Sequence, residues 1–265
     1  MQTNELLARW RRNERTLGTW LSMANTHSAE SLANTGYDWL CCDLQHGLLD
    51  YADLRTMLPA MTGRGVAALV RVPWNEPYEI MKVLDLGAQG VIVPLVNNAQ
   101  EAQQAVWACR YPPAGGRSFG PIRAAMVGGR GYAEQANEQI ACIAMIETRE
   151  GLDNLDAIAA TPGLDGIYIG PSDLALALGL PAQGDTDAPD HAAAVARILA
   201  ACRTHGIAAG IHTSSAKYAK RYFEMGFNFI NVSSDVGFMM RAAVEDLRFV
   251  KSGDVPAAPT EPTGY

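Results

Sequence analysis

Long apolar runs, an excess of basic residues and paired cysteine motifs are all absent from this chain of 265 residues. No apolar run approaches the roughly 20 residues that a membrane-spanning helix needs, so we expect neither a membrane span nor a secretory signal. Acidic residues outnumber basic ones by 28 to 21, and the net charge of −7 argues against nucleic acid or an anionic membrane as the main partner. The five cysteines lack C-x-x-C spacing, which indicates buried free thiols in a cytoplasmic protein.

Two nucleotide-binding signatures are also absent. The first predicted strand is followed by SMANTH, without the glycine-rich turn of a dinucleotide-binding fold. The segment 112–131 is rich in glycine but has no G-x-x-x-x-G-K-[ST] motif, so it is not a phosphate-binding loop. Because it also has no periodicity, we predict a lid or an interface segment there, in which Arg117 and Arg123 either meet an anionic substrate or face solvent.

Short apolar segments alternate with helical segments along the rest of the chain. Eight of the apolar segments have the length and composition of strands buried on both faces. The predicted strands are 16–22, 37–45, 67–72, 90–95, 141–146, 166–170, 206–213 and 228–235. Eight such units in about 250 residues predict a single (β/α)8 TIM barrel over residues 1–251. The proline-rich tail, 252–265, is predicted to be disordered.

Two of the predicted strands are followed closely by an acid. Glu147 comes after ACIAMI and Asp173 after GIYIGPS, with a helical segment between the two strands. Neighbouring parallel strands joined by a crossover helix present their C-terminal ends on the same side, so we expect the two carboxylates to converge. Two converging carboxylates suit a hard divalent cation whose other ligands are water and substrate. The alternative is that each acid only caps the helix that follows it.

Three more polar side chains stand at the predicted ends of the second and third strands. His46 follows CDLQ, and histidine suits a general base near neutral pH, although a lone histidine is also a common structural residue. Asp43 either orients His46 or is a buried acid that backbone amides satisfy. Arg71 ends an apolar strand, where a buried guanidinium requires an anion, either a protein carboxylate or a substrate oxygen.

Trp20, His212 and Asp85 complete the set of candidates. Trp20 and His212 end the first and seventh strands and are expected to line the pocket, although His212 is equally well a polar residue of the rim. Asp85 lies late in a predicted helix, where the helix dipole disfavours an acid, so we expect a cation such as His46 to compensate it.

Six runs of residues carry a family resemblance: YDWLCCDLQHG, LVRVPWNEP, KVLDLGAQGVIVPLV, RYPPAGGRSFG, MIETREGLDNLDAI and IYIGPSDLALALG. They resemble the HpcH/HpaI aldolase family of metal-dependent, class II aldolases. The similarity extends from Thr16 to about Val250, and ETREG and GPSDL are its most specific blocks.

The resemblance implies a role for most of the candidate residues. The cofactor would be a divalent ion, Mg²⁺, Mn²⁺ or Co²⁺. The implied site consists of the metal ligands Glu147 and Asp173, the base His46 paired with Asp85, Arg71 beside the keto oxygen of a 2-oxo acid, and the turn Gly170, Pro171 and Ser172 at the substrate carboxylate.

The implied reaction is the cleavage or formation of a 4-hydroxy-2-oxo acid. Deprotonation of the 4-hydroxyl by His46, through water, would break the C3–C4 bond and leave the enolate of pyruvate or hydroxypyruvate on the cation, beside the released aldehyde. No predicted strand ends in lysine, which argues against a Schiff-base aldolase. The alternatives are a CoA-ester lyase of the citryl or malyl type, which needs positive charge for its nucleotide, and a non-catalytic 2-oxo-acid binding protein.

The resemblance also implies an assembly. Family members are typically hexamers, trimers of dimers that exchange the last helix, so we expect this helix to pack on a neighbouring barrel. Two positions depart from the family pattern. Gln45 stands where many relatives have Glu before the histidine, and Met145 stands where many have Gln two residues before the metal-binding Glu. Neither departure removes a ligand, but together they leave the donor open between pyruvate and hydroxypyruvate.

Overall fold

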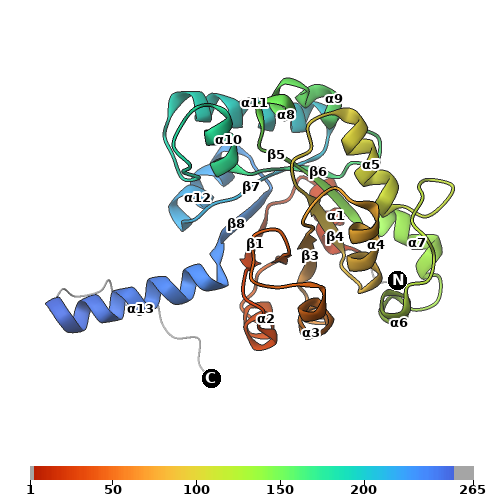
Figure 1. Ribbon diagram of the computed structural model, residues 1–265, viewed down its shortest axis with the longest axis horizontal. Coiled ribbons are helices and arrows are strands. Elements are labelled where there is room, and N and C mark those ends of the chain that lie inside the picture. Colours follow the sequence, from red (N-terminus) through yellow and green to blue (C-terminus); the bar gives the residue numbers. More distant parts are fainter. Residues whose placement is uncertain (1–2, 254–265) are drawn as a thin grey trace.

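Eight parallel strands close into a barrel that helices surround (Figure 1). The computed structural model describes residues 3–253. The strands are β1 Thr16–Leu21, β2 Trp39–Asp43, β3 Ala67–Arg71, β4 Gly90–Val93, β5 Ala141–Ile146, β6 Gly166–Ile169, β7 Ala208–Ile211 and β8 Phe229–Ser234. Each strand pairs in parallel with the next one in the sequence, and β8 returns to pair with β1. The predicted (β/α)8 barrel is confirmed, with strand bounds that differ from the prediction by a few residues.

The helices connect the strands on the outside of the barrel, apart from α1 at one end and α13 beyond the last strand. Their bounds are α1 Glu5–Arg11, α2 Thr26–Ala33, α3 Tyr51–Met61, α4 Pro77–Asp85, α5 Ala99–Cys109, α6 Ile122–Gly128, α7 Tyr132–Gln139, α8 Arg149–Asp153, α9 Leu155–Ala159, α10 Pro171–Ala177, α11 Pro189–His205, α12 Ala216–Met225 and α13 Asp235–Ser252. The prediction of a segment without regular structure at 112–131 is wrong for α6. Its run IRAAMVG contains good helix formers but is too short for a period to be read.

Aromatic side chains fill the interior of the barrel. The Trp39 and Phe229 ring centroids lie 4.5 Å apart, and those of Tyr168 and Phe229 lie 5.1 Å apart. Trp39 fits because Gly18 lies beside it on β1: a Cβ at residue 18 would stand 2.1 Å from the indole. Large residues are thus matched by small ones on the neighbouring strand, as close packing of a narrow barrel requires.

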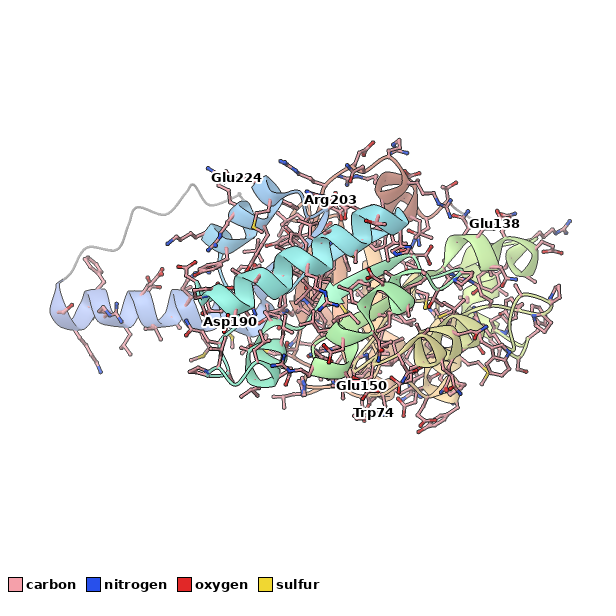
Figure 2. All side chains as sticks on the ribbon, turned by 90° about the horizontal axis from the view of Figure 1, so that it is seen from above. Trp74, Glu138, Glu150, Asp190, Arg203 and Glu224 are labelled. Atoms are coloured by element: carbon pink, nitrogen blue, oxygen red, sulfur yellow. The ribbon has the colours of Figure 1, made fainter. Side chains whose placement is uncertain are left out.

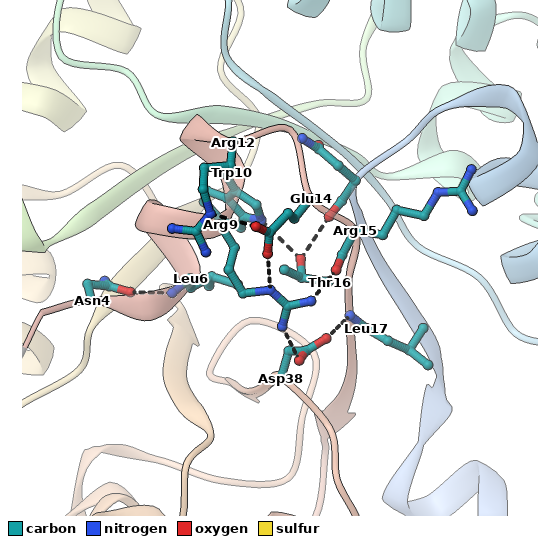
Figure 3. Close-up of polar contacts among 11 residues, drawn as sticks. Asn4, Leu6, Arg9, Trp10, Arg12, Glu14, Arg15, Thr16, Leu17 and Asp38 are labelled. Carbon is teal, nitrogen blue, oxygen red and sulfur yellow. Dashed lines mark hydrogen bonds and ion pairs between the residues drawn. The ribbon is translucent and has the colours of Figure 1, made fainter.

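Helix α1 closes the N-terminal end of the barrel (Figure 3). Trp10 packs edge-on against Phe229, with 4.6 Å between the ring centroids. Arg9 forms an ion pair with Asp38, whose second oxygen accepts a hydrogen bond of 2.7 Å from the backbone N–H of Leu17. This end is therefore occupied by structural contacts, and the C-terminal ends of the strands are left for the functional residues.

The last helix, α13, projects away from the barrel in both views (Figures 1 and 2). Ser252 still belongs to this helix, so the predicted tail does not begin there, and residues 254–265 lie outside the described residues. Among residues 3–253, no helix combines the length and hydropathy that a bilayer crossing requires. All five cysteines are buried and free, as predicted.

Gly18→Ala is expected to lower the free energy of unfolding by about 1–3 kcal/mol, because its Cβ would overlap the buried Trp39 indole. Urea unfolding followed by fluorescence measures the change. Gly120→Ala is the matched control, since nothing lies within 4 Å of a Cβ there, and it should change the free energy by less than about 0.5 kcal/mol. Equal losses in the two variants would contradict the packing argument.

Candidate active site

The polar side chains predicted at the strand ends gather at the C-terminal end of the barrel. Asp43 and Arg71 are the last residues of β2 and β3 and are register partners across the two strands. Glu147 follows β5 directly, and residues 170–173 follow β6. Because all the strands are parallel, their C-terminal ends share one rim, which brings these groups together.

Arg71 and Asp43 form a two-pronged ion pair. The Nε and Nη2 atoms of Arg71 donate to Asp43 Oδ1 and Oδ2 over 2.8 and 2.7 Å. The anion that a buried arginine requires is therefore a protein carboxylate. Burial alone would raise the pKa of Asp43, but hydrogen bonds and charge from Arg71, with the backbone N–H groups of His46 and Gln45, lower it below its usual value.

The remaining face of the Arg71 guanidinium is held by an aromatic ring and a thioether. Its carbon lies 4.6 Å from the ring centroid of Trp20, and Nη1 lies 3.9 Å from Met145 Sδ. Trp20 is only 2% exposed, so it forms part of the floor of the site. The guanidinium is thereby fixed in orientation while its charge stays at the rim.

His212 also packs against Trp20, edge-on, with 5.4 Å between the ring centroids. Its backbone N–H donates to the carbonyl of Ile169, one residue before the turn at 170–173. Burial, and after it the charge of Arg71, lowers the pKa of His212 to about 4. The imidazole is therefore neutral at pH 7, where it can donate and accept hydrogen bonds.

Glu147 is buried, with 3% of its surface exposed. Its Oε1 atom accepts a hydrogen bond of 2.8 Å from the backbone N–H of Leu95, which has a left-handed backbone with φ of 54°. Burial, reinforced by the charge of Asp173, raises the pKa of Glu147 to about 7 against the opposing effects of Leu95 and Arg71. Helix α8 is capped by the side chain of Thr148, so the alternative that Glu147 is only a helix cap is wrong.

The turn at 170–173 packs directly against Glu147. A Cβ at Gly170 would lie 2.1 Å from Glu147 Oε2, so only glycine allows this approach. Asp173, in the first turn of α10, is exposed and near enough for its charge to act on Glu147. The predicted convergence of the two carboxylates is therefore supported by their electrostatic interaction.

These residues fit a hard divalent cation. Glu147 and Asp173 offer carboxylate oxygens, and a cation beside them would stabilise the ionised form of a glutamate that burial disfavours. Residues 3–253 contain no group of three or more His, Cys, Asp and Glu side chains that could hold a metal ion. Water and substrate would therefore complete the shell, as Mg²⁺ commonly requires.

Among residues 3–253, no hydrogen bond or ion pair joins His46 to Asp85. His46 is exposed on the turn after β2, at the C-terminal end of the barrel. Asp85 is the last residue of α4, and its Oδ1 accepts a hydrogen bond of 2.7 Å from Arg117 Nη2. The cation that compensates Asp85 in this chain is therefore Arg117, and the expectation that it would be His46 is wrong.

The expectation that Arg117 and Arg123 would either meet an anionic substrate or face solvent is wrong, because both form contacts within the chain. The Arg117 side chain is fully buried, donates to Asp85 and Tyr132, and lies 4.5 Å from the ring centroid of Tyr111. Arg123 donates to the backbone carbonyl of Leu86 and to Thr62. Both arginines thus hold the segment to the barrel.

Two features of the site escaped the sequence reasoning. The backbone N–H of Leu95 carries no side-chain signal, although the break of the apolar run at VPLVNN marks its position. His191 is fully buried in α11, and its Nε2 lies 3.0 Å from the carbonyl oxygen of Pro171. A single histidine in an alanine-rich helix has no pattern that would link it to a distant turn.

Comparisons with known proteins agree with this geometry. Residues 16–242 match the family model described as HpcH/HpaI aldolase/citrate lyase. The chain is 38% identical over 250 residues to the 2-dehydro-3,6-dideoxy-6-sulfogluconate aldolase of Pseudomonas putida, covering 94% of this chain and 97% of that protein. It is 40% identical over 258 residues to a hydroxypyruvate/pyruvate aldolase of Paraburkholderia phytofirmans, covering 94% and 98%. The crystal structure of an HpcH/HpaI aldolase/citrate lyase family protein from Burkholderia cenocepacia J2315 superposes with a TM-score of 0.88 at 38% identity, over 94% of this chain and all of that one.

The lowered pKa of His212 predicts a pH-dependent stability. The unfolded chain binds this proton near pH 6.5 and the folded chain only near pH 4, so wild type should lose stability relative to His212→Gln as the pH falls through this window. The relative loss should approach about 1.4 kcal/mol per pH unit, measured by urea unfolding at pH 7, 6 and 5.

His27→Gln is the matched control, because the His27 side chain is 91% exposed. It should keep the wild-type dependence on pH. Parallel pH profiles for wild type and His212→Gln would show that His212 is not held neutral.

Proposed function

The chain belongs to the HpcH/HpaI aldolase/citrate lyase family, and from this premise we propose that it is a divalent-metal-dependent, class II aldolase. It is a carbon–carbon lyase that cleaves or forms 4-hydroxy-2-oxo acids, with pyruvate or hydroxypyruvate as the donor and an aldehyde as the acceptor. The observation that carries this function is one rim of the barrel on which Glu147 and Asp173 lie near a fixed Arg71.

Glu147 and Asp173 would hold Mg²⁺, Mn²⁺ or Co²⁺, which would act as a Lewis acid on the carbonyl of the bound 2-oxo acid. Bond cleavage places negative charge on the keto oxygen of the donor. Arg71 would stabilise that charge. Two hydrogen bonds to Asp43 and the contact with the Trp20 ring already fix the orientation of its guanidinium, so the side chain would need little reorganisation during the reaction.

The turn at 170–172 binds the substrate carboxylate in this proposal. No side chain caps α10, so the backbone at the start of this helix is available to an anionic group. Trp20 and the neutral His212 form the neighbouring wall. A carboxylate held here lies next to the metal acids, because Gly170 packs directly on Glu147.

His46 is the proposed base that takes the proton of the 4-hydroxyl through a water molecule. Its exposed position on the rim leaves room for that water, and its backbone N–H donates to Asp43 over 3.2 Å, which links the base to the Arg71 pair. The pairing of His46 with Asp85 stays a prediction.

The donor and the location of the enzyme are further parts of the proposal. Met145 places a thioether, and no polar amide, beside Arg71, while the buried Oε1 of Gln45 has no partner among residues 3–253. A panel of aldehydes, scored by kcat/KM with pyruvate and with hydroxypyruvate, would identify the preferred donor.

The proposed location of the enzyme is the cytoplasm, because its buried cysteines are free thiols.

Helix α13 supports a proposed dimer in which two subunits exchange their last helices. It carries a row of large apolar side chains on an exposed surface, and helices in proteins gain most of their stability by packing such a face against another element. The row consists of Val236, Met239, Met240, Val244, Leu247 and Val250, each at least 36% exposed. A second barrel that covers this row would make a stable dimer, and three such dimers would form the expected hexamer.

Glu147→Gln should reduce pyruvate release from a 4-hydroxy-2-oxo acid by more than about 100-fold, because an amide cannot replace the charged ligand. A coupled lactate dehydrogenase assay with Mn²⁺ measures it. EDTA should abolish the wild-type activity and added Mn²⁺ should restore it. Glu150→Gln, which changes an exposed acid on α8, is the matched control and should retain activity. Pyruvate release that survives EDTA would contradict the proposed function.

The double variant Met240→Lys, Leu247→Lys should dissociate the assembly, because two charges on the apolar row oppose its burial. Light scattering coupled to size-exclusion chromatography measures the mass. Glu245→Lys, an exposed charge change on the same helix, should leave the mass unchanged. A wild-type protein that runs as a monomer would rule out the exchange.

A further inference from the structure

His191 lies in the first turn of α11 and is fully buried. Its Nε2 atom is 3.0 Å from the carbonyl oxygen of Pro171. Since a carbonyl oxygen only accepts, Nε2 must carry the hydrogen of this bond. The other ring nitrogen, Nδ1, has no partner among residues 3–253, so nothing there stabilises a second proton. The ring is therefore a neutral imidazole with one directed donor.

The acceptor of this bond belongs to the turn that carries the proposed ligand Asp173. Pro171 is the first residue of α10, which is only seven residues long and has no side-chain cap. A proline is well suited to this first position, because its ring presets the helical φ and the missing N–H would have no intrahelical partner there. The bond from His191 therefore adds a contact from a separate element, α11, to the start of this short helix.

The loop between α10 and α11 packs over the same turn. A Cβ at Gly184 would lie 3.2 Å from Pro171 Cγ and 3.4 Å from Ser172 Oγ, so this loop covers the turn closely. Asp185, the next residue, accepts hydrogen bonds from the backbone N–H of Ser214 and from the hydroxyl of Ser215, over 3.1 and 2.7 Å. The loop is thus tied to the start of α12, and His191 follows it at the start of α11.

We propose that His191 is a positioning residue of the metal and 2-oxo-acid site: its Nε2–H holds the Pro171 carbonyl, so that Asp173 stays opposite Glu147. This inference rests on the proposed function. Glu147 cannot adjust to a displaced turn, because it is buried and bonded to Leu95. Loss of the anchor should therefore separate the two carboxylates, and outer contacts of this kind commonly change metal affinity by about 10–100-fold.

The test compares substitutions that keep or lose the donor. His191→Gln places an amide N–H near the position of Nε2, and it should bind Mn²⁺ within about threefold of wild type. His191→Leu has a similar volume but no donor, and His191→Asn has a donor too short to reach the carbonyl. Both should raise the dissociation constant of Mn²⁺ and the KM of the 2-oxo acid by about 10–100-fold, with kcat at saturating Mn²⁺ much less affected.

Mn²⁺ binding is measured by electron paramagnetic resonance on the full chain, beside the thermal midpoint and the steady-state constants. Ile198→Ala is the matched control: it opens a cavity at a fully buried position of the same helix without touching the turn. It should lower the thermal midpoint and leave Mn²⁺ affinity unchanged. If His191→Leu fails to fold, the Mn²⁺ affinities of His191→Gln and His191→Asn are compared, because only the Gln side chain is long enough to donate to the Pro171 carbonyl.

The outcomes separate this inference from the proposed function. A wild-type chain that neither binds Mn²⁺ nor releases pyruvate overturns the function, and the role of His191 with it. An active wild type whose Leu and Asn variants bind Mn²⁺ as tightly as wild type overturns the role of His191 alone. Equal weakening of Mn²⁺ binding in His191→Gln, His191→Asn and Ile198→Ala would assign the effect to general destabilisation. That result would also overturn the proposed role of His191.

Discussion

A buried carboxyl group in the mouth of an apolar barrel is the constraint on which the rest of this structure depends. Glu147 is 3% exposed, and its pKa is raised to about 7 by burial and by the charge of Asp173. The chain offers it one hydrogen bond from Leu95, whose backbone adopts a left-handed conformation at that point. One neutral donor does not offset the loss of water around a full charge, so this carboxyl group ionises at a higher pH than a solvent-exposed glutamate.

The ion pair of Arg71 and Asp43 divides the site into two electrostatic halves. Asp43 accepts hydrogen bonds from both Nε and Nη2 of the Arg71 guanidinium. Arg71 is therefore paired with Asp43 and does not form an ion pair with Glu147. In the proposed function, the half with Glu147 and Asp173 would hold the cation, and the half with Arg71 would stabilise an anionic oxygen. A 2-oxo acid has a carboxylate and a carbonyl on adjacent carbons, and a site with both halves at one rim suits it.

Elements outside the barrel also meet the site. Asp173 lies in the first turn of the short α10, and the turn before it is contacted by His191 of α11 and approached by Gly184 of the loop at 180–188. Helix α13 contributes nothing to its own barrel beyond its first residues, and its apolar row faces solvent. Asp43, Arg71 and Glu147 thus stand at the ends of barrel strands, while Asp173 lies on the short α10 and the exposed apolar row on the peripheral α13.

The sequence by itself determined the eight-stranded barrel and the rim positions of Glu147 and Arg71, because burial on both faces leaves continuous apolar runs and polar residues then mark the strand ends. Tertiary structure alone decided the pairings: Arg71 with Asp43, Asp85 with Arg117, and His191 with Pro171. A local pattern reports the period of one element and the face that it buries. It holds no information about which side chains of separate elements meet once the barrel has closed, and a lone buried residue such as His191 has no period at all.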